Sequence, residues 1–253
     1  LVAVLVGVAG AVRDDETRPG ATKPAVDPDV VRRITVGQGE TGATIVVRGR
    51  LKPRRPVVVF LHGWRLVGPE AYREWIDHLA RGGNIVIVPR YQKRSNQDPA
   101  ELLGNVVAGL RSSFRRVPSP YGPVIAAGHS AGAALAADYA AIAQEARLPV
   151  PDAVFAVFPG RAIRADASVP VFDPARIDPS TRVVALVGSR DEVVGSAPAQ
   201  TLIDSLGSLP PERRRLVTVT EPAAADHFAP VFDRPAVRRQ FWARLDQLIR
   251  SSG

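Results

Sequence analysis

The stretch Val124–Ala140, VIAAGHSAGAALAADYA, passes from an apolar strand pattern to a small-residue helix pattern within a few positions. Ser130 stands at the junction, between Gly128 and Gly132. A strand that turns sharply into a helix leaves no room for side chains two positions before and after the turn, and glycine removes them. The serine hydroxyl would then be exposed at the amide end of the helix, where developing negative charge is favoured. This pattern is typical of a nucleophile and not of ordinary packing.

Strand and helix patterns alternate on both sides of this turn. Apolar strand runs are predicted at 56–63, 84–91, 123–130, 152–160, 182–188 and 214–220, and helices at 71–83, 98–114, 131–146, 197–207 and 234–250. Two shorter strand patterns at 30–37 and 43–49 flank a Gly-containing turn and predict an antiparallel hairpin. Alternating strands and helices require a mostly parallel sheet with helices on both faces, and ligands bind at the carboxyl ends of its strands.

The first residues differ from the rest of the chain. LVAVLVGVAGAV is apolar, and the polar, Pro- and Gly-containing stretch 13–29 follows it abruptly. We expect residues 1–12 to be the remnant of a secretory signal or an anchor, with Ala9-Gly10-Ala11 fitting a small-x-small cleavage pattern; an ordinary first strand is the alternative. Residues 13–29 are expected to be a flexible linker and residues 30–253 one α/β domain. Export to the cell envelope or medium is therefore expected, although a cytoplasmic location stays open.

Composition limits the classes of function. The 253 residues carry a net charge of +8, supplied almost entirely by arginines in scattered pairs and triples. No aromatic residues interleave with them, so no nucleic-acid partner is predicted. Either a solvated basic surface or weak attraction to anionic lipid, polymer or substrate fits this charge. The chain has no cysteine, which excludes disulfides and thiolate nucleophiles, and four histidines make a multi-histidine metal site improbable.

The elbow at Ser130 and the order of the elements resemble the α/β-hydrolase family from about Val30 to the C-terminus. The resemblance places the general base at His227, in the loop EPAAADHFAP after the last strand. It places the orienting acid at Asp191, after the strand at 182–188, with Val194 matching a common family position. Glu192 and Asp226 are the rival acids. His62, His129 and His78 lie in motif or helix positions that do not suit a base.

The resemblance also implies an oxyanion hole and a pocket. The amide of Ala131 follows the nucleophile, and the amide of Trp64 follows His62-Gly63. The Trp64 ring is expected to wall the acyl pocket, with packing at the rim as the alternative. Tyr91 is expected either to line the same cleft or to pack in the core. The stretch 161–181 has no helical repeat of apolar residues, so no large helical cap is predicted.

These expectations define a serine carboxylic ester hydrolase that works through an acyl-enzyme and needs no metal or organic cofactor. A serine at the elbow argues against dehalogenase, epoxide hydrolase and dienelactone hydrolase chemistry. Acyltransferase, thioesterase or peptidase activity of the same residues stays open, as does a non-catalytic binding module. The substrate is expected to be a small or polymeric ester, and membrane contact only if residues 1–12 remain as an anchor. The absence of Gly-x-Gly-x-x-Gly after an early strand counts against a dinucleotide site.

Overall fold

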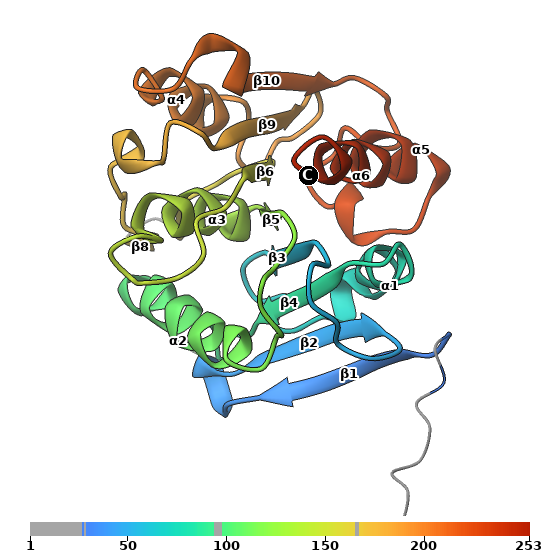
Figure 1. Cartoon of the computed structure of the whole chain (residues 1–253). Coiled ribbons are helices and arrows are strands. Elements are labelled where there is room, and N and C mark those ends of the chain that lie inside the picture. The colour runs from blue at the N-terminus through green and yellow to red at the C-terminus, as the bar shows by residue number, and fades with distance from the viewer. Residues whose placement is uncertain (1–26, 28, 94–97, 165–166) are drawn as a thin grey trace, which may run out of the picture.

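The computed structural model describes residues 27, 29–93, 98–164 and 167–253. An eight-stranded sheet runs through its centre in the order β1-β2-β4-β3-β5-β6-β9-β10 (Figure 1). Its strands are β1 Val31–Val36, β2 Ala43–Arg48, β3 Val57–Leu61, β4 Ile85–Pro89, β5 Val124–His129, β6 Ala153–Val157, β9 Arg182–Gly188 and β10 Arg214–Val219. The pairs β1–β2 and β2–β4 are antiparallel, and the remaining pairs are parallel. The predicted hairpin and mostly parallel sheet are confirmed.

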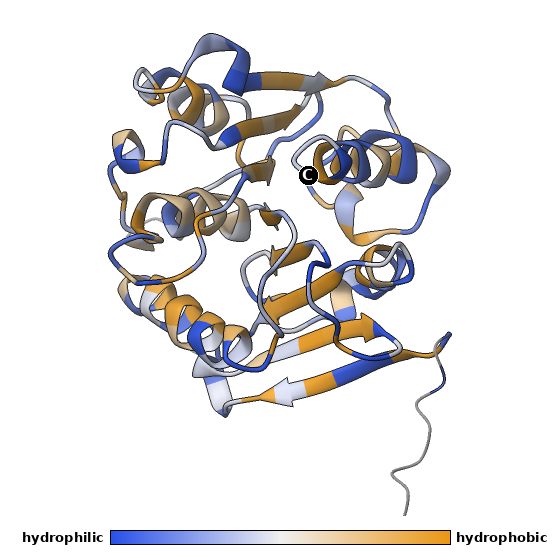
Figure 2. Ribbon diagram, in the orientation of Figure 1, coloured by the Kyte–Doolittle hydropathy of each residue, from blue (hydrophilic) through white to orange (hydrophobic). Residues whose placement is uncertain are grey.

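Helices cover both faces of the sheet. They are α1 Arg73–Arg81, α2 Leu102–Phe114, α3 Ala131–Ile142, α4 Ala197–Ser205, α5 Pro235–Val237 and α6 Ala243–Arg250, with a π-helical turn at Arg238–Trp242 joining the last two. Side chains of α2, α3 and α4 form one buried core with the sheet, and those of α1 and the α5–α6 segment form the other. Figure 2 shows apolar residues concentrated on the strands and on the inward sides of the helices.

Alternation along the strands assigns their side chains to these two cores. In β3, Val57, Val59 and Leu61 pack on the α2–α3 side, while Val58 and Phe60 pack on the α1–α6 side. Every residue of β3 is buried, as expected for a parallel strand covered on both faces. The two cores hold the strands in register, and the loops that follow their carboxyl ends lie together at one edge of the sheet.

Between β6 and β9 the described residues form only a short antiparallel pair, β7 Ala162–Arg164 with β8 Ala167–Ser168, and a 3-10 turn at Pro174–Arg176. The prediction that no large helical cap covers the sheet is confirmed. The predicted signal or anchor at 1–12 lies outside the described residues, as does the linker at 13–29 apart from Asp27 and Asp29. No described helix is both long enough and apolar enough to cross a bilayer.

Candidate active site

The turn between β5 and α3 holds Ser130 in a strained backbone conformation, with φ 57° and ψ −124°. Few non-glycine residues adopt such angles, and they persist only where the surrounding structure imposes them. Here the Ser130 amide donates to the Val157 carbonyl at 3.0 Å, and the Gly160 amide donates to the Ser130 carbonyl at 3.2 Å. The loop after β6 therefore holds the turn in place from one side.

The two glycines of the turn are required by close backbone contacts. A Cβ on Gly128 would lie 2.3 Å from the Gly132 carbonyl oxygen, and a Cβ on Gly132 would lie 2.2 Å from the Leu61 carbonyl oxygen. Both distances are far inside van der Waals contact. The small residues thus let the first turn of α3 press against the end of β3, which brings the loop after β3 beside Ser130.

Ser130, His227 and Asp191 are brought together at the carboxyl edge of the sheet. His227 Nε2 lies 3.0 Å from Ser130 Oγ, and His227 Nδ1 lies 2.8 Å from Asp191 Oδ2. Ionised Asp191 can only accept, so Nδ1 carries the hydrogen and Nε2 is free to accept from the serine hydroxyl. The side chains of His227 and Asp191 are almost wholly buried, which keeps water from competing for these bonds.

Asp191 is held in its ionised form. Burial raises the pKa of this carboxyl, but hydrogen bonds from His227 and from the Val194 and Val193 amides outweigh burial and leave the pKa below its usual value. Both amides donate to Oδ1 at 3.0 Å. One carboxylate oxygen is therefore fixed by backbone, and the other is directed at the imidazole.

Close contact between the loops after β9 and β10 explains how two residues far apart in sequence meet. A Cβ on Gly188, the last residue of β9, would lie 2.2 Å from the Ala225 carbonyl oxygen. The Arg190 amide donates to that same carbonyl at 3.2 Å. Only glycine at position 188 lets the loop that carries His227 lie this close to Asp191.

A buried chain of hydrogen bonds joins the three loops of the site. His129 Nε2 donates to the His227 carbonyl at 2.8 Å, which leaves Nδ1 to accept from the Tyr72 hydroxyl at 2.7 Å. That hydroxyl oxygen accepts from the Gly63 amide at 3.0 Å. Burial, followed by the nearby His227, lowers the pKa of His129 to about 3, so the ring is neutral and each bond has one direction. The chain ties the loop after β3 to the loop that carries the imidazole.

Ala131 and Trp64 lie where the sequence placed candidate oxyanion donors. Ala131 is the first residue of α3. Trp64 follows Gly63 in the loop after β3, and Gly132 packs against the start of that loop. Among the described residues, neither backbone amide donates to a protein acceptor. Backbone N–H groups that have no protein acceptor can donate hydrogen bonds to a negative charge that develops on a substrate oxygen. The Trp64 ring is half-buried against the α2–α3 core, so packing at the rim describes its present contacts.

Tyr91 does not line an open cleft, and the expectation that it would is wrong in this structure. Its side chain has no exposed surface, stacks on the His62 ring with centroids 4.0 Å apart, and donates its hydroxyl hydrogen to the His62 carbonyl. The alternative of core packing holds. Tyr91 therefore supports the loop after β3 from below.

The remaining histidines and the rival acids take other places. His62 and His129 are buried and bonded to backbone carbonyls, while His78 pairs with Asp246 at 2.8 Å between α1 and α6. Glu192 and Asp226 are exposed, and the two ring nitrogens of His227 have Asp191 and Ser130 as their hydrogen-bond partners instead. No group of three or more potential metal ligands occurs among the described residues.

The chain has the α/β-hydrolase fold. No protein-family model and no curated protein sequence matches it. Solved structures of the same fold include carboxyl esterase 2 of the fungus Tuber melanosporum, at 14% identity over 89% of each chain and a TM-score of 0.64. Esterase B of Lactobacillus rhamnosis is 16% identical over 90% of this chain and 88% of its own, also with a TM-score of 0.64. A dienelactone hydrolase-like protein of Klebsiella pneumoniae is 18% identical over 87% of this chain and 98% of its own, with a TM-score of 0.63.

Proposed function

We propose that the protein is a serine hydrolase that cleaves carboxylic esters through a covalent acyl-enzyme. The observation that supports this most directly is the imidazole of His227, which lies 3.0 Å from Ser130 Oγ and 2.8 Å from Asp191 Oδ2. An uncharged serine needs such a base to become nucleophilic. Esterases are also among the solved proteins that share the fold.

In the first half-reaction, Ser130 Oγ attacks the ester carbonyl carbon while its proton moves to His227 Nε2. Asp191 stabilises the imidazolium and fixes the ring, and the amides of Ala131 and Trp64 hold the oxyanion. The tetrahedral intermediate collapses when the bond to the alcohol oxygen breaks and His227 gives that oxygen its proton. Water then gives a proton to His227 as its oxygen attacks the acyl carbon. The second tetrahedral intermediate collapses when the bond from the acyl carbon to Ser130 Oγ breaks and His227 returns the proton to Oγ, which releases the acid and the free serine.

The test compares the native protein with Ser130→Ala, using a fluorophosphonate probe and p-nitrophenyl esters of graded acyl length. Labelling and turnover are expected in the native protein and in Ser196→Ala, which removes an exposed serine elsewhere, but not in Ser130→Ala. Labelling of Ser130→Ala at the native rate would overturn the proposal. Labelling without hydrolysis of any ester would favour an acyltransferase, a thioesterase or a peptidase, and a folded protein that takes no label would be a binding module.

The role of Asp191 has its own matched pair. Asp191→Asn should lower kcat about 10³- to 10⁴-fold, because the amide favours the wrong imidazole tautomer. Glu192→Gln changes the neighbouring exposed carboxylate in the same way and should leave kcat within about twofold. Equal losses in both variants would exclude Asp191 as the orienting acid.

A further inference from the structure

The end of the molecule opposite the candidate active site is strongly basic. The parallel strands β3, β5, β6, β9 and β10 all start at this end. β9 and β10 begin with Arg182 and Arg214, and the segments that lead into the other three strands carry further arginines. We define the basic face by its members Arg48, Arg50, Lys52, Arg54, Arg111, Arg115, Arg116, Arg147, Arg182 and Arg213. All are exposed except Arg182 and Arg213, which are half-buried.

The cations of the basic face are not neutralised locally. Across the residues that the structure describes, none of them forms an ion pair with a carboxylate. Two of the acids at this end have other partners: Glu145 pairs with Arg176, and Asp152 accepts the Val124 amide at 2.7 Å. Glu212 and Asp29 line hollows beside members of the basic face, but the cations there outnumber them. Positive charge is therefore concentrated here and directed to solvent.

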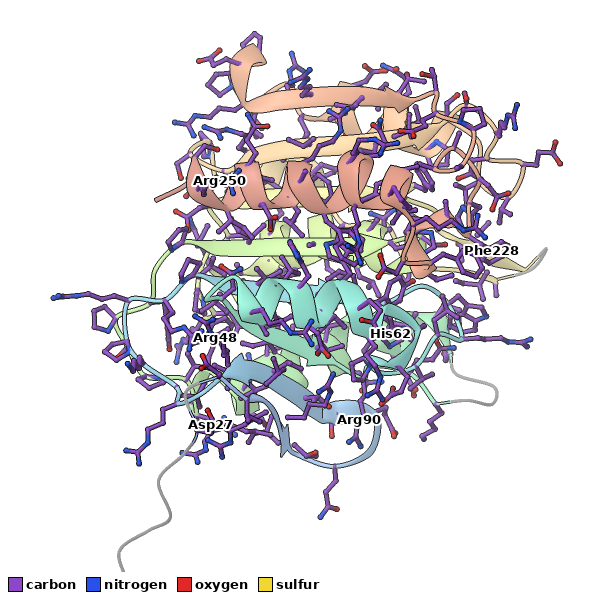
Figure 3. All side chains as sticks on the ribbon, turned by 90° about the vertical axis from the view of Figure 1, so that its right-hand side faces the viewer. Asp27, Arg48, His62, Arg90, Phe228 and Arg250 are labelled. Atoms are coloured by element: carbon purple, nitrogen blue, oxygen red, sulfur yellow. The ribbon has the colours of Figure 1, made fainter. Side chains whose placement is uncertain are left out.

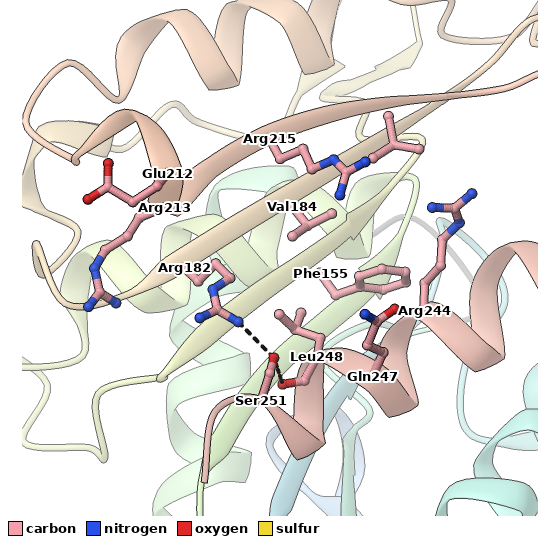
Figure 4. Close-up of a pocket in the computed structure, with 11 residues that line it drawn as sticks. Phe155, Arg182, Val184, Glu212, Arg213, Arg215, Arg244, Gln247, Leu248 and Ser251 are labelled. Carbon is pink, nitrogen blue, oxygen red and sulfur yellow. Dashed lines mark hydrogen bonds between the residues drawn. The ribbon is translucent and has the colours of Figure 1, made fainter.

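Shallow hollows lie between several of these cations. One hollow of about 210 Å³, between α6 and the start of β9 and β10, has an apolar floor that includes Val184 and Leu248 and several arginines around it (Figure 4). Arg182 is fixed there by the Ser251 hydroxyl at 2.7 Å, and Arg213 donates to the Ser180 carbonyl. Neutral partners hold these guanidinium groups without cancelling their charge.

The opposite end carries charges of both signs. Around the candidate active site, Arg65 and Arg190 stand among Glu70, Glu192 and Asp226. The cations of the basic face, by contrast, lie at the opposite end from Ser130 and form no ion pair among the described residues. An anionic surface would orient such a molecule with its basic face inward.

The start of the described chain lies at the same end as the basic face. Figure 3 places Asp27, Arg48 and Arg250 on one side of the molecule and His62, Arg90 and Phe228 on the other. Asp29 lines a hollow together with Arg48, Arg50, Lys52 and Arg55. The described chain therefore begins beside the basic face.

We propose that the basic face docks on the surface of an anionic lipid bilayer and turns the candidate active site away from it. Guanidinium and ammonium groups next to anionic headgroups attract them over about a Debye length. The ester substrate would then reach Ser130 from the aqueous side and not from the bilayer. This docking does not depend on which reaction Ser130 performs.

The exposed apolar side chains at the other end define the competing orientation. Phe228 is 51% exposed and Val193 is 59% exposed, both beside the candidate active site. If these residues entered the bilayer, the serine would face lipid and the basic face would point to water. An experiment on docking must therefore report which end is in contact, and not binding alone.

The first measurement is sedimentation of the full chain with phosphatidylcholine vesicles, with and without phosphatidylglycerol, at low and physiological salt. At each salt concentration, the partition coefficient onto vesicles with phosphatidylglycerol is divided by that onto vesicles without it. This ratio separates the charge-dependent part of binding from any contribution of residues 1–12. The triple variant Arg50→Gln, Lys52→Gln, Arg115→Gln should lower partitioning onto phosphatidylglycerol vesicles roughly tenfold to a hundredfold. Salt should weaken the binding of the native protein in the same direction.

A matched triple variant removes the same charge from elsewhere: Arg73→Gln, Arg190→Gln, Arg234→Gln. It should lower partitioning by no more than about threefold, because these residues lie outside the basic face. Equal losses in the two triple variants would overturn the proposal in favour of net charge alone. No preference for phosphatidylglycerol would overturn it outright, and displacement from vesicles by an excess of heparin over lipid phosphate would point to an anionic polymer as the partner.

Orientation is read from single cysteines, which are unambiguous because the chain has none of its own. A polarity-sensitive fluorophore on Lys52→Cys should shift to the blue when phosphatidylglycerol vesicles are added, and the same label on Val193→Cys should not. The reverse pattern would overturn the proposed orientation and support docking through the apolar residues beside the candidate active site.

Discussion

Tyr72→Phe tests the buried chain that joins the loops of the site. The substitution removes one oxygen atom and leaves two buried groups without a partner, the Gly63 amide and His129 Nδ1. Each buried group left unsatisfied costs about 1–3 kcal/mol, so the free energy of unfolding should fall by about 2–6 kcal/mol. The loop that carries the Trp64 amide also loses its anchor, and kcat for ester hydrolysis should fall about tenfold, or about 1.4 kcal/mol of transition-state stabilisation.

Tyr139→Phe is the matched control for this prediction. Tyr139 is equally buried, but its hydroxyl donates to the Pro149 carbonyl, and α3 carries it away from the site. It should lose about 1–2 kcal/mol of stability and leave kcat unchanged. Urea unfolding gives the two stabilities, and initial rates on a p-nitrophenyl ester give kcat and KM. If the two variants lose the same fraction of kcat, the hydroxyl of Tyr72 stabilises the fold without positioning the oxyanion loop.

Three further predictions concern stability, each measured by urea unfolding. Gly132→Ala should cost more than about 3 kcal/mol or abolish folding, because its Cβ would lie 2.2 Å from a carbonyl oxygen of β3, whereas Gly104→Ala, with nothing within 4 Å, should gain about 0.5–1 kcal/mol. Equal effects of the two alanines would contradict this. The pKa of His129 is lowered to about 3 in the folded protein, so below about pH 6.5 the unfolded chain binds a proton at this residue and the folded protein does not. The contribution of His129 to the free energy of unfolding should therefore fall by about 1.4 kcal/mol per pH unit between about pH 6.5 and pH 3. A free energy of unfolding that stayed constant between pH 6.5 and 5 would be inconsistent with a neutral buried ring. Arg161→Gln strands the buried carboxylate of Asp138, whose pKa burial already raises, and should cost about 3 kcal/mol at pH 7 but less at pH 5; a cost that grew on acidification would refute the reasoning.

The succession of strands along the chain and the position of Ser130 at a strand-to-helix turn could be predicted from sequence, because both depend on local signals. Continuous apolar runs give the buried strands, and the two glycines around Ser130 give the sharp turn. The mostly parallel pairing followed from the alternation of strands with helices, whereas the order of the strands across the sheet is known from the structure alone. His227 and Asp191 followed from the family resemblance together with their places after strands.

The contacts that hold the site could not be predicted, because they join distant parts of the chain. Tyr72 falls within the helix predicted at 71–83 and ends a 3-10 turn just before α1. Only the need of a buried hydroxyl for a hydrogen-bond partner could have marked it. Gly188 ends a strand, as glycines often do, and nothing in the local sequence indicates its close approach to the Ala225 carbonyl in a distant loop. Tyr91 follows a strand as a pocket residue would, yet its ring stacks on His62 inside the core.

The long chain separations within the site make its appearance a late event in folding. Ser130 and His227 are 97 positions apart, and the bond from His129 to the His227 carbonyl spans 98. Contacts of such separation form only after the intervening strands have paired, since their loop entropy must be met first. Ester turnover regained on dilution from denaturant would therefore lag behind recovery of helical circular dichroism. In this chain, the rate at which ester turnover recovers would therefore report the rate at which the loops after β9 and β10 reach their places beside Ser130.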